Sequence, residues 1–193
     1  MSEIKRPRRR TGAAALRSVT VALAAALLLG ACSTARRAPI ATVPHVDLQR
    51  FMGDWYVIAA IPTFVEKNAY DAVESYRLGA DGTIRTTYTF RRGGFDGPVK
   101  TLRPRGWIVD KTSNARWAMQ FVWPIKAQYL IAYLSPDYGE TIIARDARDY
   151  VWIMAREPTL TVGEFRRLRG VVASLGYDTA QLRLVPQRRP APK

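Results

Sequence analysis

The sequence has few of the side chains that most enzymes use. It contains one histidine, His45, and one cysteine, Cys32, in 193 residues. Both stand before the first expected strand, so neither is placed to join a Cys–His or Ser–His pair or a zinc site. Several carboxylates fall at expected strand ends and loops, where solvation is their ordinary role: Asp110, Asp137, Asp146 and Asp149. We therefore expect no enzyme, no metal site and no cofactor.

Long apolar runs are also scarce. The run from Val19 to Leu29 is too short to span a bilayer, and it follows a basic N-terminus. A basic start, a short apolar centre and small residues before Cys32 are typical of a secretory signal. The final Leu29-Gly30-Ala31-Cys32 resembles a bacterial lipobox, which implies cleavage before Cys32 and its acylation, for example with palmitate. The alternative is an ordinary secretory signal with an incidental cysteine.

The lipobox divides the N-terminal part into two segments. Residues 1–31 are the expected lipoprotein signal peptide, and residues 32–45, which are small, basic and proline-containing, are the expected flexible tether. Position 33 is Ser33 rather than the aspartate that usually keeps a lipoprotein in the inner membrane. This resemblance implies a lipid-anchored protein of the outer membrane that faces the periplasm.

Acidic residues are much fewer than basic residues. The chain has 30 Lys and Arg against 16 Asp and Glu, a net charge of +14, which falls to about +9 once residues 1–31 are removed. Without zinc spacing, a helix-turn-helix pattern or a glycine-rich loop, this charge does not point to nucleic acid. A basic surface beside a membrane fits anionic lipid phosphates, and solvated charge that keeps a β-rich protein soluble is the alternative.

What the sequence does have is a series of short β-prone runs. Between turn residues, strands are expected at 72–78, 83–90, 99–110 and 116–123. In the last of these, Trp117, Met119 and Phe121 alternate with more polar residues, and Tyr88 and Phe90 alternate likewise in the second. This period of two predicts an antiparallel sheet with one apolar face turned inward.

Two later runs, 129–134 and 150–155, are apolar on both faces, so their outer side needs a cover. The spacing of Thr161 and Glu164 predicts a capping box that opens a helix ending at Gly176. That helix carries one apolar stripe, formed by Phe165, Leu168, Val172 and Leu175. We expect it to pack outside the sheet, followed by a last short strand at 182–185.

Three stretches resemble the signatures of the lipocalin family. Gly53-Asp54-Trp55 follows an expected helical turn, Asp137-Tyr138 lies between two strands, and residues 149–158 look like the third signature of the bacterial outer-membrane lipocalins and their apolipoprotein D relatives. The resemblance implies an all-β fold, an eight-stranded antiparallel up-and-down barrel with one C-terminal helix outside. The barrel domain would cover residues 46–187, followed by a basic tail, 188–193. It also implies that Arg156 stacks on Trp55 at the closed end.

A barrel of this family has room for one small guest, and the apolar inward side chains suit an acyl chain. The candidate cavity residues are Tyr88, Phe90, Trp117, Met119, Phe121, Tyr138 and Trp152. The same side chains can instead fill the barrel as core, a role that suits Phe121 in particular. Tyr88, Tyr138 and Trp152 are the stronger ligand candidates, because each joins an apolar body to a polar tip.

The resulting hypothesis is a membrane-anchored lipocalin, monomeric or homodimeric, that binds or carries fatty acids or lysophospholipids in the cell envelope. The lipid class comes from the family resemblance, as does a role in lipid transport, repair or storage. A lipoprotein that binds other proteins during envelope assembly is the first alternative. An enzyme built on the lipocalin fold is the second.

Overall fold

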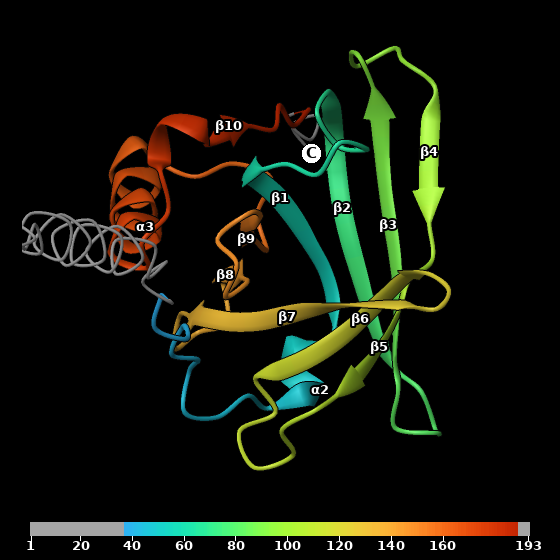
Figure 1. Cartoon of the computed structure of the whole chain (residues 1–193). Helices are drawn as coiled ribbons and strands as arrows, with labels where there is room; N and C mark the ends of the chain where they lie inside the picture. Colours follow the sequence, from blue (N-terminus) through green and yellow to red (C-terminus); the bar gives the residue numbers. More distant parts are fainter. Residues whose placement is uncertain (1–36, 189–193) are drawn as a thin grey trace, which may run out of the picture. The chain divides into compact units, whose positions relative to one another are not determined.

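The computed structural model describes residues 37–188, and within them strands dominate. Short turns connect most of the strands, and one long helix follows the last barrel strand (Figure 1). In chain order the elements are α2 (Leu48–Phe51), β1 (Gly53–Ile61), β2 (Ala69–Leu78), β3 (Ile84–Arg92), β4 (Val99–Leu102), β5 (Arg105–Ile108), β6 (Arg116–Val122), β7 (Ile125–Leu134), β8 (Glu140–Ala144), β9 (Val151–Ala155), α3 (Val162–Ser174), the 3-10 turn η2 (Thr179–Gln181) and β10 (Arg183–Leu184).

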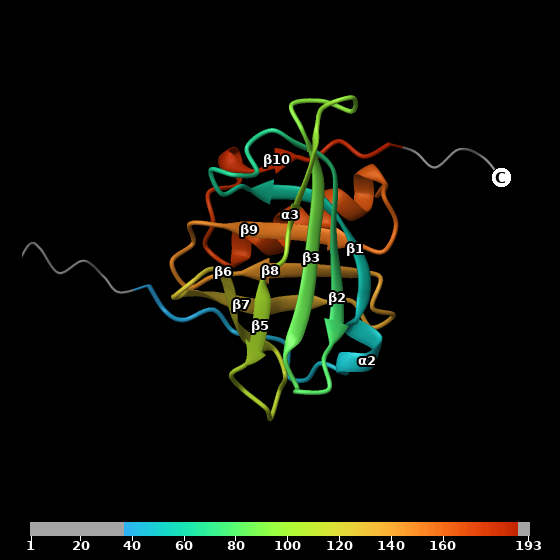
Figure 2. The ribbon, with the colours of Figure 1, turned by 90° about the vertical axis from the view of Figure 1, so that its right-hand side faces the viewer.

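The strands form one antiparallel barrel, which confirms the predicted fold. Neighbours follow the order β1-β2-β3-β5-β6-β7-β8-β9, and β1 also pairs with β9, so the sheet closes on itself. Figure 2 shows β2 and β3 on the near wall, with β7, β8 and β9 crossing behind them. The strand predicted at 99–110 is split into β4 and β5 around Pro104, because proline has no N–H to give to the sheet.

A glycine allows α2 to turn directly into β1. Asp47 caps α2 by accepting hydrogen bonds from the backbone N–H groups of Gln49 and Arg50 at 2.9 and 3.3 Å. Gly53 then has φ +97°, which a residue with a side chain rarely adopts, and a Cβ there would lie 3.3 Å from an Arg156 nitrogen. The chain thereby delivers Trp55 into the barrel, where it is fully buried.

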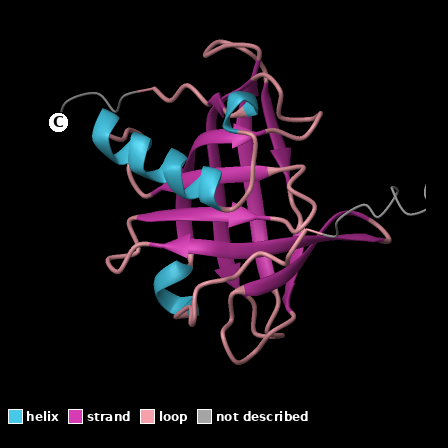
Figure 3. Ribbon diagram, turned by 60° about the vertical axis from the view of Figure 1, so that its left-hand side comes forward, coloured by secondary structure: helices cyan, strands magenta, loops and turns pink. Residues whose placement is uncertain are grey.

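Helix α3 covers the outer face of the barrel, as predicted. Thr161 and Glu164 form the complete capping box, and the helix ends before Gly176, which has φ +87°. Leu168 and Val172 are buried against the outward side chains of β1, β7, β8 and β9, and Figure 3 shows α3 lying across these strands. No helix within residues 37–188 combines the length and the apolar character that a membrane span requires.

The segment before α2 differs from the expected flexible tether. From Ala38 onwards it packs on the barrel: Ile40 is only 2% exposed, and its N–H donates to Asp146 at 2.6 Å. The N–H of Val43 donates to the carbonyl of Ile131 at 3.0 Å, and Nδ1 of His45 lies 3.3 Å from the carbonyl oxygen of Thr112. The flexible interpretation is therefore wrong for residues 38–45, because the apolar side chains of Ile40 and Val43 dock this proline-containing segment on the barrel. Residues 1–36 and 189–193, which hold the expected signal peptide, Cys32 and most of the basic tail, lie outside the described part.

Candidate functional site

The closed end of the barrel is built around one arginine. The guanidinium of Arg156 lies 3.9 Å from the centre of the Trp55 ring, which confirms the predicted stacking. Its nitrogens donate to four backbone carbonyls at 2.7–3.0 Å, those of Arg50, Phe51, Met52 and Asp54. Partial burial lowers the pKa of Arg156, although a guanidinium stays charged at neutral pH. Arg156 thus ties α2 and the start of β1 to the end of β9.

Tyr138 belongs to this closed end, so its predicted place in the ligand cavity is wrong. It has φ +63° in the turn between β7 and β8, and its hydroxyl accepts a hydrogen bond from the N–H of Asp47 at 2.9 Å. The guanidinium of Arg50 lies 4.0 Å from the centre of its ring. The turn after β7 therefore places Tyr138 against the base of α2, at the closed end of the barrel, where it packs on the edge of the core.

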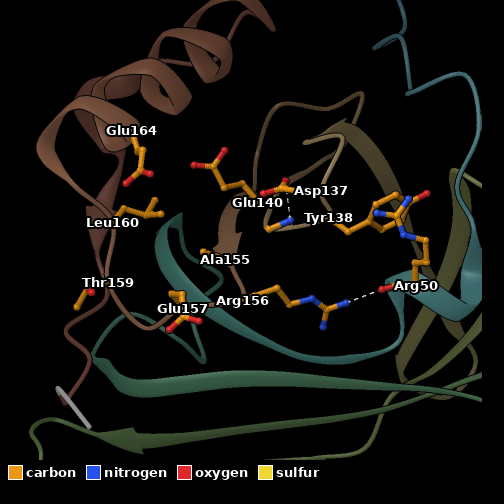
Figure 4. Close-up of a pocket in the computed structure, with 11 residues that line it drawn as sticks. Arg50, Asp137, Tyr138, Glu140, Ala155, Arg156, Glu157, Thr159, Leu160 and Glu164 are labelled. Carbon is orange, nitrogen blue, oxygen red and sulfur yellow. Dashed lines mark hydrogen bonds between the residues drawn. The ribbon is translucent and has the colours of Figure 1, made fainter. Parts of the chain in front are cut away.

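A polar surface cavity of about 580 Å³ lies beside Tyr138 (Figure 4). Most of its carboxylates already serve the fold: Asp137 accepts from the N–H of Gly139, Glu140 pairs with Arg167, and Glu164 caps α3. In the figure, Arg156 reaches across the cavity towards the carbonyl of Arg50. This arrangement stabilises the closed end and leaves little free chemistry for a ligand.

The barrel interior brings together five of the predicted cavity residues. Each is at most 6% exposed: Tyr88, Phe90, Trp117, Met119 and Trp152. Tyr88 and Phe90 stack on each other, and Trp117 and Trp152 each pack on Tyr129, a residue that we did not predict. Trp117 stacks on Tyr129 with centroids 5.4 Å apart, and Tyr129 packs on Trp152 at 6.4 Å.

Phe121 does not join them, and its predicted inward orientation is wrong. The register between β6 and β7 shifts after Met119, so the alternation that points Trp117 inward is lost two residues before the hairpin turn. Phe121 is 46% exposed at the hairpin tip, beside Trp123 at 83% and Ile125 at 69%. The alternation of apolar residues in the sequence continues beyond Met119, where the register between β6 and β7 changes.

The interior is largely filled by these side chains. A cavity of about 20 Å³ lies near the end of β1, bordered by Val57, Ala60, Glu66, Ala69 and Tyr88. That volume holds about one water molecule, whereas ligand pockets usually measure about 300–1,000 Å³. In this conformation the aromatic residues pack as core, so a lipid-sized guest requires side chains to move.

Glu74 on β2 is the main interior residue that the sequence analysis missed. It is 5% exposed, and its carboxylate accepts hydrogen bonds from the hydroxyls of Tyr76 and, at 3.5 Å, Tyr129. Burial, with the nearby carboxylate of Glu66, raises the pKa of Glu74 from 4.5 to about 8. The signal was available, because Ala72, Glu74 and Tyr76 occupy alternate, inward positions of one strand.

A second carboxylate, Glu66, stands at the end of the barrel opposite Arg156. It belongs to the loop 62–68 between β1 and β2, and it accepts a hydrogen bond from the indole N–H of Trp152 at 3.2 Å. Its other oxygen accepts from the N–H and the hydroxyl of Thr63, at 3.1 and 2.6 Å. Glu66 therefore holds this loop against Trp152, and we call this end of the barrel the mouth.

Comparison with known proteins agrees with this architecture. A family model described as a lipocalin-like domain matches residues 46–187. Temperature-induced lipocalin-1 of Arabidopsis thaliana is 29% identical over 163 residues, covering 78% of this chain and 84% of that protein. The outer membrane lipoprotein Blc of Escherichia coli (strain K12) is 26% identical over 172 residues, covering 88% and 95%.

A solved structure leads to the same fold. Insecticyanin from the tobacco hornworm Manduca sexta superposes with a TM-score of 0.60 at 14% identity, covering 76% of this chain and 83% of that one. The resemblance to lipocalins that the three sequence stretches predicted is therefore confirmed. Together with the closed barrel and the Arg156–Trp55 pair, the match over residues 46–187 shows that the chain belongs to the lipocalin-like domain family.

Proposed function

We propose that this protein is a lipid-anchored lipocalin of the bacterial envelope that binds a small hydrophobic ligand, a fatty acid or a lysophospholipid, inside its barrel. The observation that carries the proposal is the buried aromatic interior, which runs from Trp117 through Tyr129 to Trp152 at the mouth. Similarity to outer membrane lipoproteins named Blc over 88% of the chain supports an envelope location.

The energy available from an acyl chain is sufficient for binding. A dozen buried methylenes at about 0.8 kcal/mol each give about 10 kcal/mol, and micromolar affinity needs about 8 kcal/mol. Part of this gain is spent on rearranging the packed interior and on ordering the chain. Loop 62–68 is the element that we expect to move, because few hydrogen bonds join it to the strands around it: the indole of Trp152 on β9 donates to Glu66, and the N–H of Gly93 donates to the carbonyl of Asn68.

Replacement of Trp152 tests the interior site. Trp152→Ala is expected to weaken micromolar binding of a fluorescent fatty acid or lysophospholipid about tenfold or more, because it removes an aromatic wall at the mouth. Arg85→Ala is the control, since Arg85 is exposed on the outer face of β3. The measurement is tryptophan quenching or energy transfer in delipidated protein, with thermal melts to verify folding. Equal affinity in both variants, or no binding by the unmodified protein, would contradict the proposal.

The anchor is tested at Cys32. If this residue is acylated, the protein partitions into detergent with the outer-membrane fraction, and Cys32→Ser is soluble in the periplasm or keeps its signal peptide. Cys32 lies outside residues 37–188, and a thermal melt of each form distinguishes a change in anchoring from a change in folding. Fractionation followed by immunoblotting measures both the location and the size of each form. Equal association of the two forms with the outer membrane, both without the signal peptide, would exclude the anchor.

Protein binding in envelope assembly is a second candidate, favoured by the apolar tip of the β6–β7 hairpin. Phe121, Val122, Trp123 and Ile125 are 46–83% exposed there. Extraction of the purified protein with organic solvent separates the two functions. Stoichiometric lipid in the extract supports the carrier, and its absence together with a co-purifying envelope protein supports assembly.

A further inference from the structure

We propose that the barrel interior selects an apolar chain with a cationic head, a primary ammonium, through Glu74 and the aromatic rings around it. This inference rests on the proposed function and narrows its ligand class. The cationic head would lie deep in the barrel at Glu74, and the apolar chain would extend towards the mouth residues Glu66 and Trp152.

The carboxyl group of Glu74 lacks a positive partner. It is 5% exposed, and among residues 37–188 no salt bridge involves it; its contacts are the hydroxyls of Tyr76 and Tyr129. A buried carboxylate without a counter-charge is costly, which is why burial raises the pKa of Glu74 to about 8. In the empty barrel the carboxyl group therefore keeps its proton at pH 7. A guest that brings its own positive charge favours release of that proton and pairs with the resulting carboxylate, whereas a guest that brings a negative charge opposes it.

Aromatic rings surround the same position. Tyr76 packs against Trp117 with ring centroids 5.8 Å apart and against Tyr129 at 6.3 Å, while Trp117 and Tyr129 stack on each other. The faces of such rings attract cations, most strongly where water is excluded. A carboxylate enclosed by tryptophan and tyrosine therefore combines two independent sources of attraction for an ammonium.

A third observation favours an ammonium that still carries hydrogen atoms. Thr86 is 4% exposed on the inward face of β3, directly opposite Tyr76, and its hydroxyl has no hydrogen-bond partner in the described part of the chain. A primary ammonium offers three N–H donors, enough to serve a carboxylate, a tyrosine oxygen and a threonine oxygen together. A buried hydroxyl without a partner is unfavourable, so a guest that donates an N–H to it gains binding energy.

The charge of the rest of the protein makes this interior distinctive. The whole chain carries a net charge of +14, whereas the two charged side chains identified above along the interior path, Glu66 and Glu74, are both acidic. The outer surface therefore repels cationic amphiphiles, so any preference for them has to arise inside the barrel. A fatty acid, in contrast, would have to leave its carboxylate outside, near the mouth.

The test compares three twelve-carbon probes that differ only in the head group. Isothermal titration of delipidated full-length protein at pH 7 with dodecylammonium, dodecanol and dodecanoate measures the contribution of charge. The expected result is that dodecylammonium binds about 10- to 100-fold more tightly than dodecanol. Glu74→Gln, which keeps the shape of the side chain, is expected to abolish this preference and to leave dodecanol binding unchanged. Asp96→Asn, which removes an exposed carboxylate, is expected to preserve the preference.

The outcomes separate this inference from the proposed function. Equal binding of dodecylammonium and dodecanol by the unmodified protein would overturn the inference while leaving a hydrophobic site in place. An unaltered preference in a folded Glu74→Gln variant would also overturn it. If none of the three probes binds, the proposed ligand-binding function fails as well. The comparison within the unmodified protein remains decisive even if the Glu74 variant does not fold.

Discussion

Glu74→Gln is expected to make the protein more stable than the unmodified chain at pH 8, by a few kcal/mol, and to flatten the dependence of stability on pH. Burial raises the pKa of Glu74 to about 8 in the folded protein, against an ordinary value of 4.5. Glutamine has the same shape but carries no charge, so its burial does not become more costly as the pH rises. The effect is large because this carboxyl group is almost completely buried.

The sign follows from the protons that each state binds. Between about pH 4.5 and 8 the unfolded chain has released the Glu74 proton while the folded chain retains it. The contribution of Glu74 to stability is therefore complete below about pH 4.5 and is lost progressively as the pH approaches 8. Each pH unit in this window changes the free energy of unfolding by up to about 1.4 kcal/mol. Urea unfolding of both proteins at several pH values between 5 and 8 measures the difference.

The groups that face Glu74 limit the alternative explanations. Burial raises the pKa of Tyr88 and of Tyr129, so these hydroxyls stay protonated throughout the window, and Tyr76 donates to the carboxylate from the same strand. Glu66 is the other carboxylate, and it raises the pKa of Glu74 by repulsion. Glu66→Gln is therefore expected to move the pH dependence to lower pH without removing it. If the free energy of unfolding depended on pH in the same way for the unmodified chain and for Glu74→Gln, the carboxyl group of Glu74 would not be buried in its neutral form.

The parts of the fold that depend on local signals could be predicted from the sequence. The capping box at Thr161, the turn at Gly53 and the strand alternation each specify backbone geometry within a few residues. The closure of the barrel and the stacking of Arg156 on Trp55 join residues that lie far apart. These two features were accessible only because the sequence resembles a family in which they occur together.

The errors occurred where tertiary contacts decide the outcome. A register shift in the β6–β7 hairpin turned Phe121 to solvent, and a turn with positive φ directed Tyr138 to α2. Ile40 docks on the barrel although it lies in a short segment of small and proline residues outside any strand or helix. Among the residues that the structure describes, Glu74 is surrounded by aromatic rings and hydroxyls from other strands rather than by a cation, and the sequence of β2 alone does not show this. The alternation in β2 did indicate that Glu74 points inward, but no local pattern encodes the partners of these four residues.

The second large effect on stability is expected at the closed end of the barrel. Arg156→Ala is expected to lower the free energy of unfolding by about 2–4 kcal/mol, because it removes the cation from Trp55 and its hydrogen bonds to four carbonyls. Within residues 37–188, only the carbonyl of Phe51 then keeps a second side-chain donor, the indole of Trp55. Arg156→Lys is expected to lose most of the same stability, since a single ammonium cannot replace the planar fork of donors. Ligand affinity at pH 7 is expected to change little in variants that fold, because Trp152 and Glu66 lie at the opposite end.

Arg167→Ala is the matched control for this prediction. Arg167 also pairs with an aromatic ring, 5.6 Å from Tyr133, and with the carboxylate of Glu140, but its side chain is 45% exposed. An exposed pair of this kind contributes about 1 kcal/mol or less. Thermal and urea unfolding at pH 7 compare the variants. If Arg156→Ala and Arg167→Ala shifted the unfolding midpoint by similar small amounts, the four carbonyl contacts would not hold the closed end together. If they differ as expected, the arginine of the third sequence stretch acts by joining α2, β1 and β9 into one end of the barrel.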